Sequence, residues 1–126
     1  MKAQELESRI EAYFAACDAT RERHPLKNGG FMERQIPYTL YGLAAATGYA
    51  PKRILMMAGR GGAGGRVLQK ALCRIGAYLM ERALLGEMPH QMALAAIATL
   101  DGEKPAEAAE KALRITMDDA AAKWAE

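Results

Sequence analysis

The stretch Tyr38–Gly59, YTLYGLAAATGYAPKRILMMAG, has the pattern of two short helices joined by a tight turn. Leu40 and Leu43 provide an apolar face at helical spacing. Gly48 falls where the chain must turn sharply, and glycine adopts a positive φ there without steric cost. Pro51 then opens the second helix, at a position where its missing N–H is not needed. The pattern predicts a helix-turn-helix at residues 38–59.

Two basic residues, Lys52 and Arg53, follow in the first turn of the second predicted helix. In helix-turn-helix proteins this end of the second helix enters the major groove of DNA. Because the helix dipole disfavours cations at a helix start, their presence favours a functional role. We therefore predict that Lys52 and Arg53 contact DNA; the alternative is a pair of solvated charges.

Four further basic residues are candidate phosphate contacts. Arg60 and Arg66 flank the glycines of the stretch Gly59–Gly65, GRGGAGG, while Lys27 and Arg34 lie in the segment before the predicted helix-turn-helix. Phosphate contacts position a protein on DNA, whereas base contacts specify the sequence that it binds. Both roles remain open for each candidate.

Charge is distributed unevenly along the 126 residues, although the net charge is only +2. Residues 1–26 carry four basic and five acidic residues, residues 27–86 nine and two, and residues 87–126 four and eight, which gives −1, +7 and −4. A basic centre attracts a phosphate backbone, and the alternative is a solvated surface on which charges cluster. The acidic end is expected to repel DNA or to dock on a basic partner.

Composition favours an all-α fold. Hydrophobic residues make up 51% of the chain, alanine, the best helix former, is abundant, and β-branched residues are sparse. We predict five or six helices that form a helix-turn-helix DNA-binding core, a helical hairpin and a C-terminal helix. The corresponding regions are residues 1–62 for the N-terminal helix and DNA binding, 63–102 for the hairpin and oligomerisation, and 103–126 for partner docking.

Periodicity and helix breakers place the other elements. The N-terminal helix is predicted over residues 3–22, followed by a loop over residues 25–37 that contains Pro25 and Asn28-Gly29-Gly30. The stretch Gly59–Gly65 is predicted as a flexible break, because five glycines in seven residues disfavour a helix. A long helix over residues 66–85 and a short one over residues 90–100 then form the hairpin.

Several classes of protein find no support in the sequence. Cys17 and Cys73 have no motif spacing and are expected to be free thiols. His24 and His90 have no Cys or carboxylate at ligand spacing, so neither a metal nor another cofactor is expected. No catalytic arrangement stands out, which argues against an enzyme. No apolar run approaches the roughly 20 residues that span a bilayer, so a soluble intracellular protein without membrane contact is expected.

Three stretches, in this order, resemble the small subunit of bacteriophage terminases, the DNA-packaging protein of tailed phages. They are IEAYFAACDA, IPYTLYGLAAATGYAPKRIL and VLQKALCRIGAYLMERALLGE, and together they lie within residues 5–100. The second is similar to the helix-turn-helix of that family, and the third to the helix that follows it.

The resemblance implies a non-enzymatic subunit that assembles into a homo-oligomeric ring and recognises the packaging start site on double-stranded viral DNA. It would recruit the large subunit, which holds the ATPase and the nuclease, in the cytoplasm of the infected bacterial host. Lys52 and Arg53 would face the DNA, and residues 103–126 would bind the large subunit. The residues that the resemblance places at or near the subunit interface, all on the long helix, are Leu72, Ile75 and Leu79.

Two other functions remain open. A small dimeric transcriptional regulator would use the same helix-turn-helix and would predict dimers and a palindromic site. A structural adaptor would use the helices only to bind proteins, and would predict no salt-sensitive DNA binding. A packaging subunit predicts instead a large closed ring.

Overall fold

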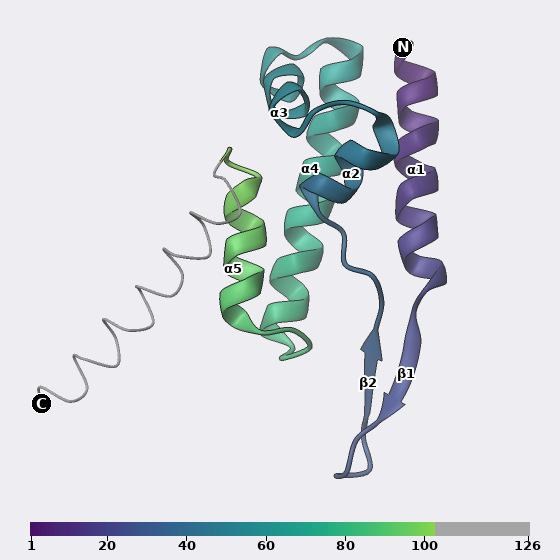
Figure 1. Cartoon of the computed structure of the whole chain (residues 1–126), viewed down its shortest axis with the longest axis vertical. Helices are drawn as coiled ribbons and strands as arrows, with labels where there is room; N and C mark the ends of the chain where they lie inside the picture. The colour runs from purple at the N-terminus through teal and green to yellow at the C-terminus, as the bar shows by residue number, and fades with distance from the viewer. Residues whose placement is uncertain (103–126) are drawn as a thin grey trace, which may run out of the picture.

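The computed structural model describes residues 1–102, which form a largely α-helical fold. The predicted α-helical class is thus confirmed, apart from a small antiparallel sheet. The C-terminal helix predicted over residues 103–126 lies outside the described residues. Figure 1 shows α5, α4 and α1 running roughly along one axis, with α2 and α3 packed across them at one end. The elements are α1 (Ala3–Ala19), β1 (Glu22–Pro25), β2 (Phe31–Arg34), α2 (Leu40–Thr47), α3 (Pro51–Arg60), α4 (Gly62–Leu84) and α5 (His90–Thr99).

Helix α1 buries one apolar face and ends earlier than the sequence predicted. Its last residue is Ala19 rather than residue 22. The backbone N–H and the side-chain hydroxyl of Thr20 both donate to the carbonyl of Cys17, and the chain then leaves the helix to form β1. The buried residues recur every three or four positions, as an amphipathic helix requires, and are Leu6, Ile10, Phe14 and Cys17.

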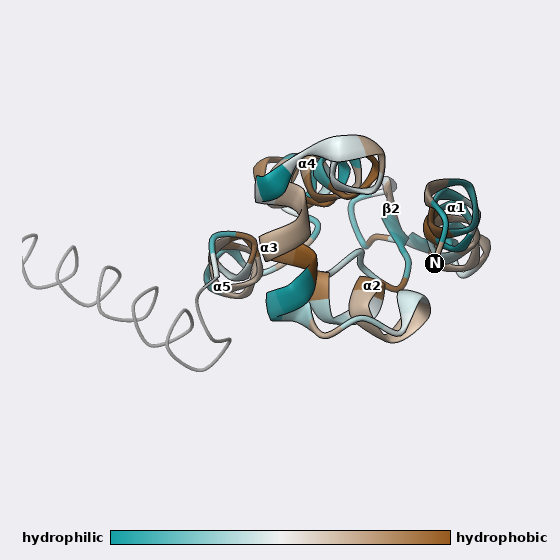
Figure 2. Cartoon of the chain, turned by 90° about the horizontal axis from the view of Figure 1, so that it is seen from above, coloured by the Kyte–Doolittle hydropathy of each residue, from teal (hydrophilic) through white to brown (hydrophobic). Residues whose placement is uncertain are grey.

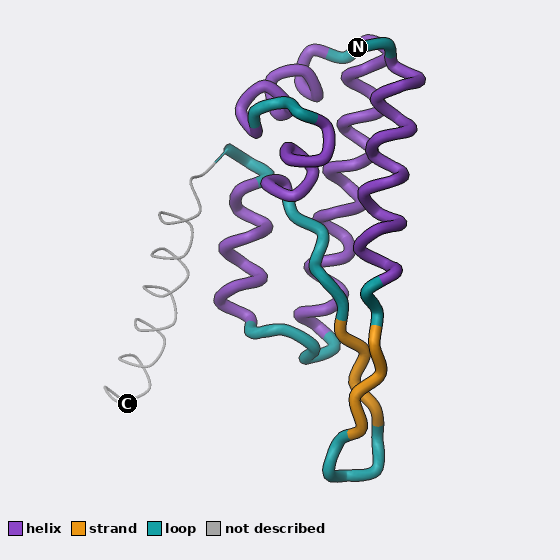
Figure 3. Tube along the Cα trace, turned by 45° about the vertical axis from the view of Figure 1, so that its right-hand side comes forward, coloured by secondary structure: helices purple, strands orange, loops and turns teal. Residues whose placement is uncertain are grey.

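A β-hairpin occupies much of the segment that was predicted as a loop. Strands β1 and β2 pair antiparallel from Glu22 opposite Arg34 to Pro25 opposite Phe31. At the tip, the Asn28 side chain accepts a hydrogen bond of 3.0 Å from a backbone N–H within the turn. Figure 3 shows the two strands projecting away from the helices. Because most strand residues are exposed, no buried face imposes the alternation by which strands are recognised.

Helices α2 and α3 form from the local signals that the sequence carries. The Thr39 side chain accepts a hydrogen bond of 3.0 Å from the backbone N–H of Gly42, which caps α2. Gly48 has φ 82° and its N–H donates to the carbonyl of Ala44, which closes α2 in the left-handed conformation. Pro51 is the first residue of α3. The predicted turn at Gly48 and helix start at Pro51 are confirmed.

The glycine-rich stretch is mostly helical, so the predicted break between two helices is present but is confined to Gly61. Helix α3 continues to Arg60 and α4 begins at Gly62, with Gly61 between them at φ 80°. The physical reason lies at Gly65, where a Cβ atom would stand only 2.5 Å from the carbonyl oxygen of Met57. The glycine lets α3 and α4 approach closely, and this packing outweighs the low helix propensity.

One cluster of buried side chains runs through the described chain, with α4 at its centre. Helix α4 packs against α1, α3 and α5, and the view from above shows the helices around a common interior (Figure 2). The cluster includes Leu6 of α1, Ile54 of α3 and Leu68 of α4. It crosses the predicted boundary, so residues 1–62 and 63–102 do not form separate cores.

The structure places Leu72, Ile75 and Leu79, which were predicted at or near a subunit interface, inside the chain. These residues expose only 8, 0 and 1% of their surface and belong to the core of the chain itself. Side chains already enclosed by their own chain offer little surface to a neighbouring subunit. The apolar stripe on α4 indicated burial correctly, but such a stripe does not reveal whether the same chain or another one covers it.

Candidate nucleic-acid interface

One side of α3 is exposed and basic. Helix α3 turns Ile54, which is fully buried, toward the core. At 3.6 residues per turn, positions 52, 53, 56 and 60 fall within a sector of about 100° on the opposite side. We call this surface the α3 cationic face, and its exposed members are Lys52, Arg53, Met56, Gly59 and Arg60.

The charges of the α3 cationic face have no partner within residues 1–102. Lys52, Arg53 and Arg60 take part in none of the ion pairs of this part of the chain. The sequence explains this, because residues 35–80 contain six basic residues and no acidic one. The N-terminal end of α3 adds the positive end of its helix dipole to the same region. The surface therefore attracts anions.

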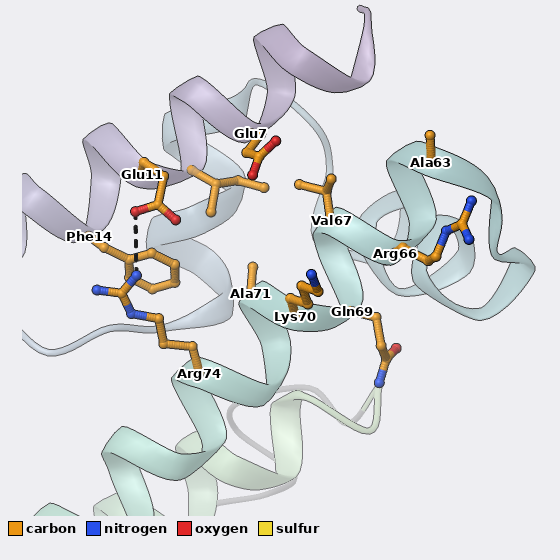
Figure 4. A pocket seen from close by; sticks show the side chains of 11 residues that line it. Glu7, Glu11, Phe14, Ala63, Arg66, Val67, Gln69, Lys70, Ala71 and Arg74 are labelled. Carbon is orange, nitrogen blue, oxygen red and sulfur yellow. Dashed lines mark ion pairs between the residues drawn. The ribbon is translucent and has the colours of Figure 1, made fainter.

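Other arginines of the basic centre are neutralised by the fold. The Arg74 guanidinium lies 3.5 Å from a Glu11 carboxylate oxygen and 4.1 Å from the centroid of the Phe14 ring, which ties α4 to α1 (Figure 4). Arg82 pairs with Glu87 at 2.5 Å where α4 turns toward α5. These two arginines hold elements together, so they are not candidates for DNA contact.

Arg66 lies on α4, outside the α3 cationic face. Its Nε donates to the carbonyl of Gly62 at 3.3 Å, within the first turns of α4. It is one of the residues that line a groove of about 520 Å³ between α1 and α4, and Figure 4 shows its side chain at the start of α4. The groove has an acidic wall that includes Glu7 and a basic wall that includes Lys70. Because walls of opposite charge largely cancel, the groove lacks the single-sign field that a phosphate backbone requires.

The structure separates Lys27 and Arg34 from the other predicted DNA contacts. Lys27 lies at the tip of the hairpin, and Arg34 is the last residue of β2. Figure 1 shows the hairpin and α3 at opposite ends of the molecule. Of the six predicted contacts, Lys27 and Arg34 thus lie apart from α3, whereas Lys52, Arg53 and Arg60 lie together on that helix.

Tyr49 supports the α3 cationic face and was missed by the sequence analysis. The guanidinium carbon of Arg53 lies 4.6 Å from the centroid of the Tyr49 ring. The ring is partly buried against the core, and its backbone N–H donates to the Thr47 hydroxyl at 3.4 Å. The signal in the sequence was an aromatic residue four positions before an arginine, but Tyr49 precedes the helix, so helical spacing did not reveal it.

A polar cluster anchors the segment that leads into α2. The Tyr38 hydroxyl donates to the carboxylate of Asp18, which also accepts from the Gln35 side chain at 3.3 Å. The hydrogen bond from Tyr38 lowers the pKa of Asp18, and burial, followed by donation to this carboxylate, raises the pKa of Tyr38. Both shifts favour ionised Asp18 beside neutral Tyr38 in the folded chain.

Acid is expected to weaken the fold through Asp18. Because its pKa is lower in the folded than in the unfolded chain, its stabilising contribution is complete above the unfolded pKa and is lost as pH falls through the folded pKa. Urea denaturation over a pH series measures this loss, and Asp18→Asn should show a smaller one. Tyr38→Phe removes the main donor and should reduce the pH dependence in the same way. An unaltered pH dependence in Asp18→Asn would contradict the assignment.

Other kinds of site are not found in residues 1–102. No group of three or more His, Cys, Asp or Glu side chains in this part of the chain is arranged to hold a metal ion. Cys17 is buried, Cys73 is exposed, and they form no disulfide. None of the helices described is long and apolar enough to cross a bilayer.

Comparison of the chain with protein-family models, curated proteins and solved structures gave no significant match.

Proposed function

We propose that the chain is the DNA-recognition subunit of a viral DNA-packaging machine, a terminase small subunit that binds duplex DNA through the α3 cationic face. One observation carries the proposal. Lys52, Arg53 and Arg60 stand exposed on one side of a helix, without an ion pair to any of residues 1–102. Three such cations on one side of a helix form a basic surface of the kind that attracts a nucleic-acid backbone.

The proposed mode of binding places α3 in the major groove as the second helix of a helix-turn-helix. The major groove of B-DNA, about 12 Å wide, admits an α-helix. The N-terminal end of α3, which carries Lys52 and Arg53, would enter the groove, as the second helix of helix-turn-helix proteins does. Arg60, one helix length further along, would contact the backbone.

The resemblance to terminase small subunits supports the remaining parts of the proposal. Copies of the chain would assemble into a ring, so that many weak DNA contacts add through multivalency. The chain would carry out no bond chemistry and need no cofactor; residues 103–126 would recruit the large subunit, with its ATPase and nuclease, in the cytoplasm of the infected bacterial host.

DNA binding is tested by the anisotropy of a labelled duplex of about 30 base pairs, titrated with the full chain between about 50 and about 300 mM salt. Binding through phosphates predicts that the logarithm of the association constant falls linearly with the logarithm of the salt concentration. Absence of binding, or binding insensitive to salt, would refute the DNA-binding function and favour a protein-binding adaptor.

Assembly is tested by native mass spectrometry of the same protein at physiological salt. A single large assembly supports the packaging subunit. A dimer would contradict it and support the alternative, a small dimeric transcriptional regulator that binds a palindromic site.

A further inference from the structure

We propose that Tyr49 is a positioning residue that aims Arg53 at a base edge, so that Arg53 reads the DNA sequence while Lys52 and Arg60 contact phosphates. The inference rests on the proposed DNA-binding function of α3 and adds to it a division of roles. It assigns the preference for a particular DNA sequence to the pair formed by Arg53 and Tyr49.

The contact between Arg53 and Tyr49 restricts an otherwise flexible side chain. The guanidinium lies over the ring at 4.6 Å, inside the roughly 6 Å range of cation–π attraction. An exposed arginine without such a contact loses rotamer freedom when it binds a base, and this loss weakens binding. Arg53 is already confined to one side of α3 before DNA arrives, so less freedom remains to be lost.

Tyr49 is itself held in place by the structure around it. It follows Gly48, whose φ of 82° sets the direction of the turn. Its N–H donates to the hydroxyl of Thr47, which is buried and donates to the carbonyl of Leu43 at 2.9 Å. The ring is partly buried against the core. Helix α2 thus fixes the ring that supports the first turn of α3.

Lys52 and Arg60, the other two cations of the α3 cationic face, lack an aromatic support, and they differ from Arg53 in charge shape or in position on the helix. Among residues 1–102, neither Lys52 nor Arg60 lies over an aromatic ring. Lysine is a point charge suited to phosphate, whereas the planar arginine fork binds O6 and N7 of guanine with two hydrogen bonds. Arg60 ends α3, away from the N-terminal end that reads bases. Arg53 therefore combines three properties: a planar guanidinium, an aromatic ring that supports it, and a place at the N-terminal end of α3.

The test selects from a random duplex library with the full-length protein and sequences the bound DNA. The wild type is expected to enrich a motif that contains a preferred guanine. Arg53→Lys keeps the charge and should reduce the preference at that base pair about tenfold, while the salt dependence of binding to a fixed duplex stays unchanged. Tyr49→Leu should reduce the same preference, and Tyr49→Phe, which keeps the ring, should retain it.

Two control variants match the substitutions. Arg66→Lys makes the same chemical change outside the α3 cationic face, and Tyr41→Leu removes an exposed tyrosine of α2 that supports no cation among residues 1–102. Both should keep the motif. Circular dichroism establishes that each variant folds. If Tyr49→Leu does not fold, Arg53→Lys and Tyr49→Phe still test the inference. Both should fold, because Arg53 is exposed and the phenylalanine ring fills the space of the tyrosine ring.

Each contrary outcome has one meaning. A wild-type motif that survives Arg53→Lys overturns base reading by Arg53, and one that survives a folded Tyr49→Leu, or is lost in Tyr49→Phe, overturns positioning by the ring. A wild type that binds DNA with normal salt dependence but enriches no motif overturns the inference and leaves the proposed function intact. Absence of salt-dependent binding to the fixed duplex refutes the proposed function itself.

Discussion

Replacing Lys52, Arg53 and Arg60 together with alanine is expected to lower the affinity for duplex DNA on the order of 100-fold near 0.1 M salt. Each phosphate contact releases condensed counterions and contributes about 0.9 to the slope of log K against log salt. Lys52 and Arg60 are the two proposed phosphate contacts, so their loss should flatten that slope by about 1.8. A titration of the variant and the wild type over the same salt range measures both quantities.

The hairpin supplies the matched control for this triple variant. Alanine at Arg23, Lys27 and Arg34 removes the same total charge, but at the end of the molecule opposite α3 (Figure 1). The hairpin variant should keep nearly the full slope. Equal losses in both triple variants would mean that DNA responds to net charge alone, and would remove the α3 cationic face as the site of contact. Thermal unfolding of both variants confirms that the fold is intact.

Replacing Gly65 with alanine is expected to destabilise the protein by about 2 kcal/mol, although alanine is the better helix former. The new Cβ would stand 2.5 Å from the carbonyl oxygen of Met57. This neighbour is a backbone atom in the last turn of α3, so it cannot rotate away as a side chain would. Helices α3 and α4 would have to move apart, which opens the packing between them. Urea denaturation measures the loss of stability.

Gly64, the preceding residue, is the control for this prediction. A Cβ there would meet Leu6 and Met57 side-chain atoms at 3.9 Å, an ordinary van der Waals contact. Gly64→Ala should therefore be neutral or stabilising by up to about 1 kcal/mol through helix propensity. Equal stability of the two variants would show that the close approach of α3 and α4 at Gly65 is absent in solution.

The helix pair was predictable because its signals are local. Thr39 caps α2 with its own side chain, Gly48 takes a left-handed conformation that glycine adopts without steric cost, and Pro51 starts α3 where its ring fits. Each requirement is met by one residue and its near neighbours. No knowledge of distant contacts is needed to place these helix ends.

The hairpin and the glycine-rich stretch depend on information that the sequence pattern does not carry. Strands β1 and β2 are mostly exposed, so hydrophobic alternation is absent, and the turn at Asn28-Gly29-Gly30 could equally belong to a loop. The helical state of residues 62–65 follows from contact between Gly65 and Met57. Helix propensity alone predicted a non-helical stretch there, because it takes no account of contacts with other parts of the chain.

The candidate site was predictable where its members are neighbours in sequence. Lys52, Arg53 and Arg60 share one helix, so helical geometry brings them to one side. Lys27 and Arg34 were grouped with them by charge alone, and a hairpin carries them away. The support of Arg53 by Tyr49 crosses a turn, where the spacing rules of helices no longer apply.

The central place of α4 limits how the protein can be dissected. A fragment that stopped after residue 62 would retain every residue of α3 but would lose the helix against which α3 packs, together with Leu68 and Ile75, which belong to the same buried cluster as Ile54. Ile54 would then face water, and burial of such a side chain is worth about 2 kcal/mol. A fragment that keeps α3 in its native orientation must therefore extend through most of α4, so α3 and the long helix behind it form one inseparable unit.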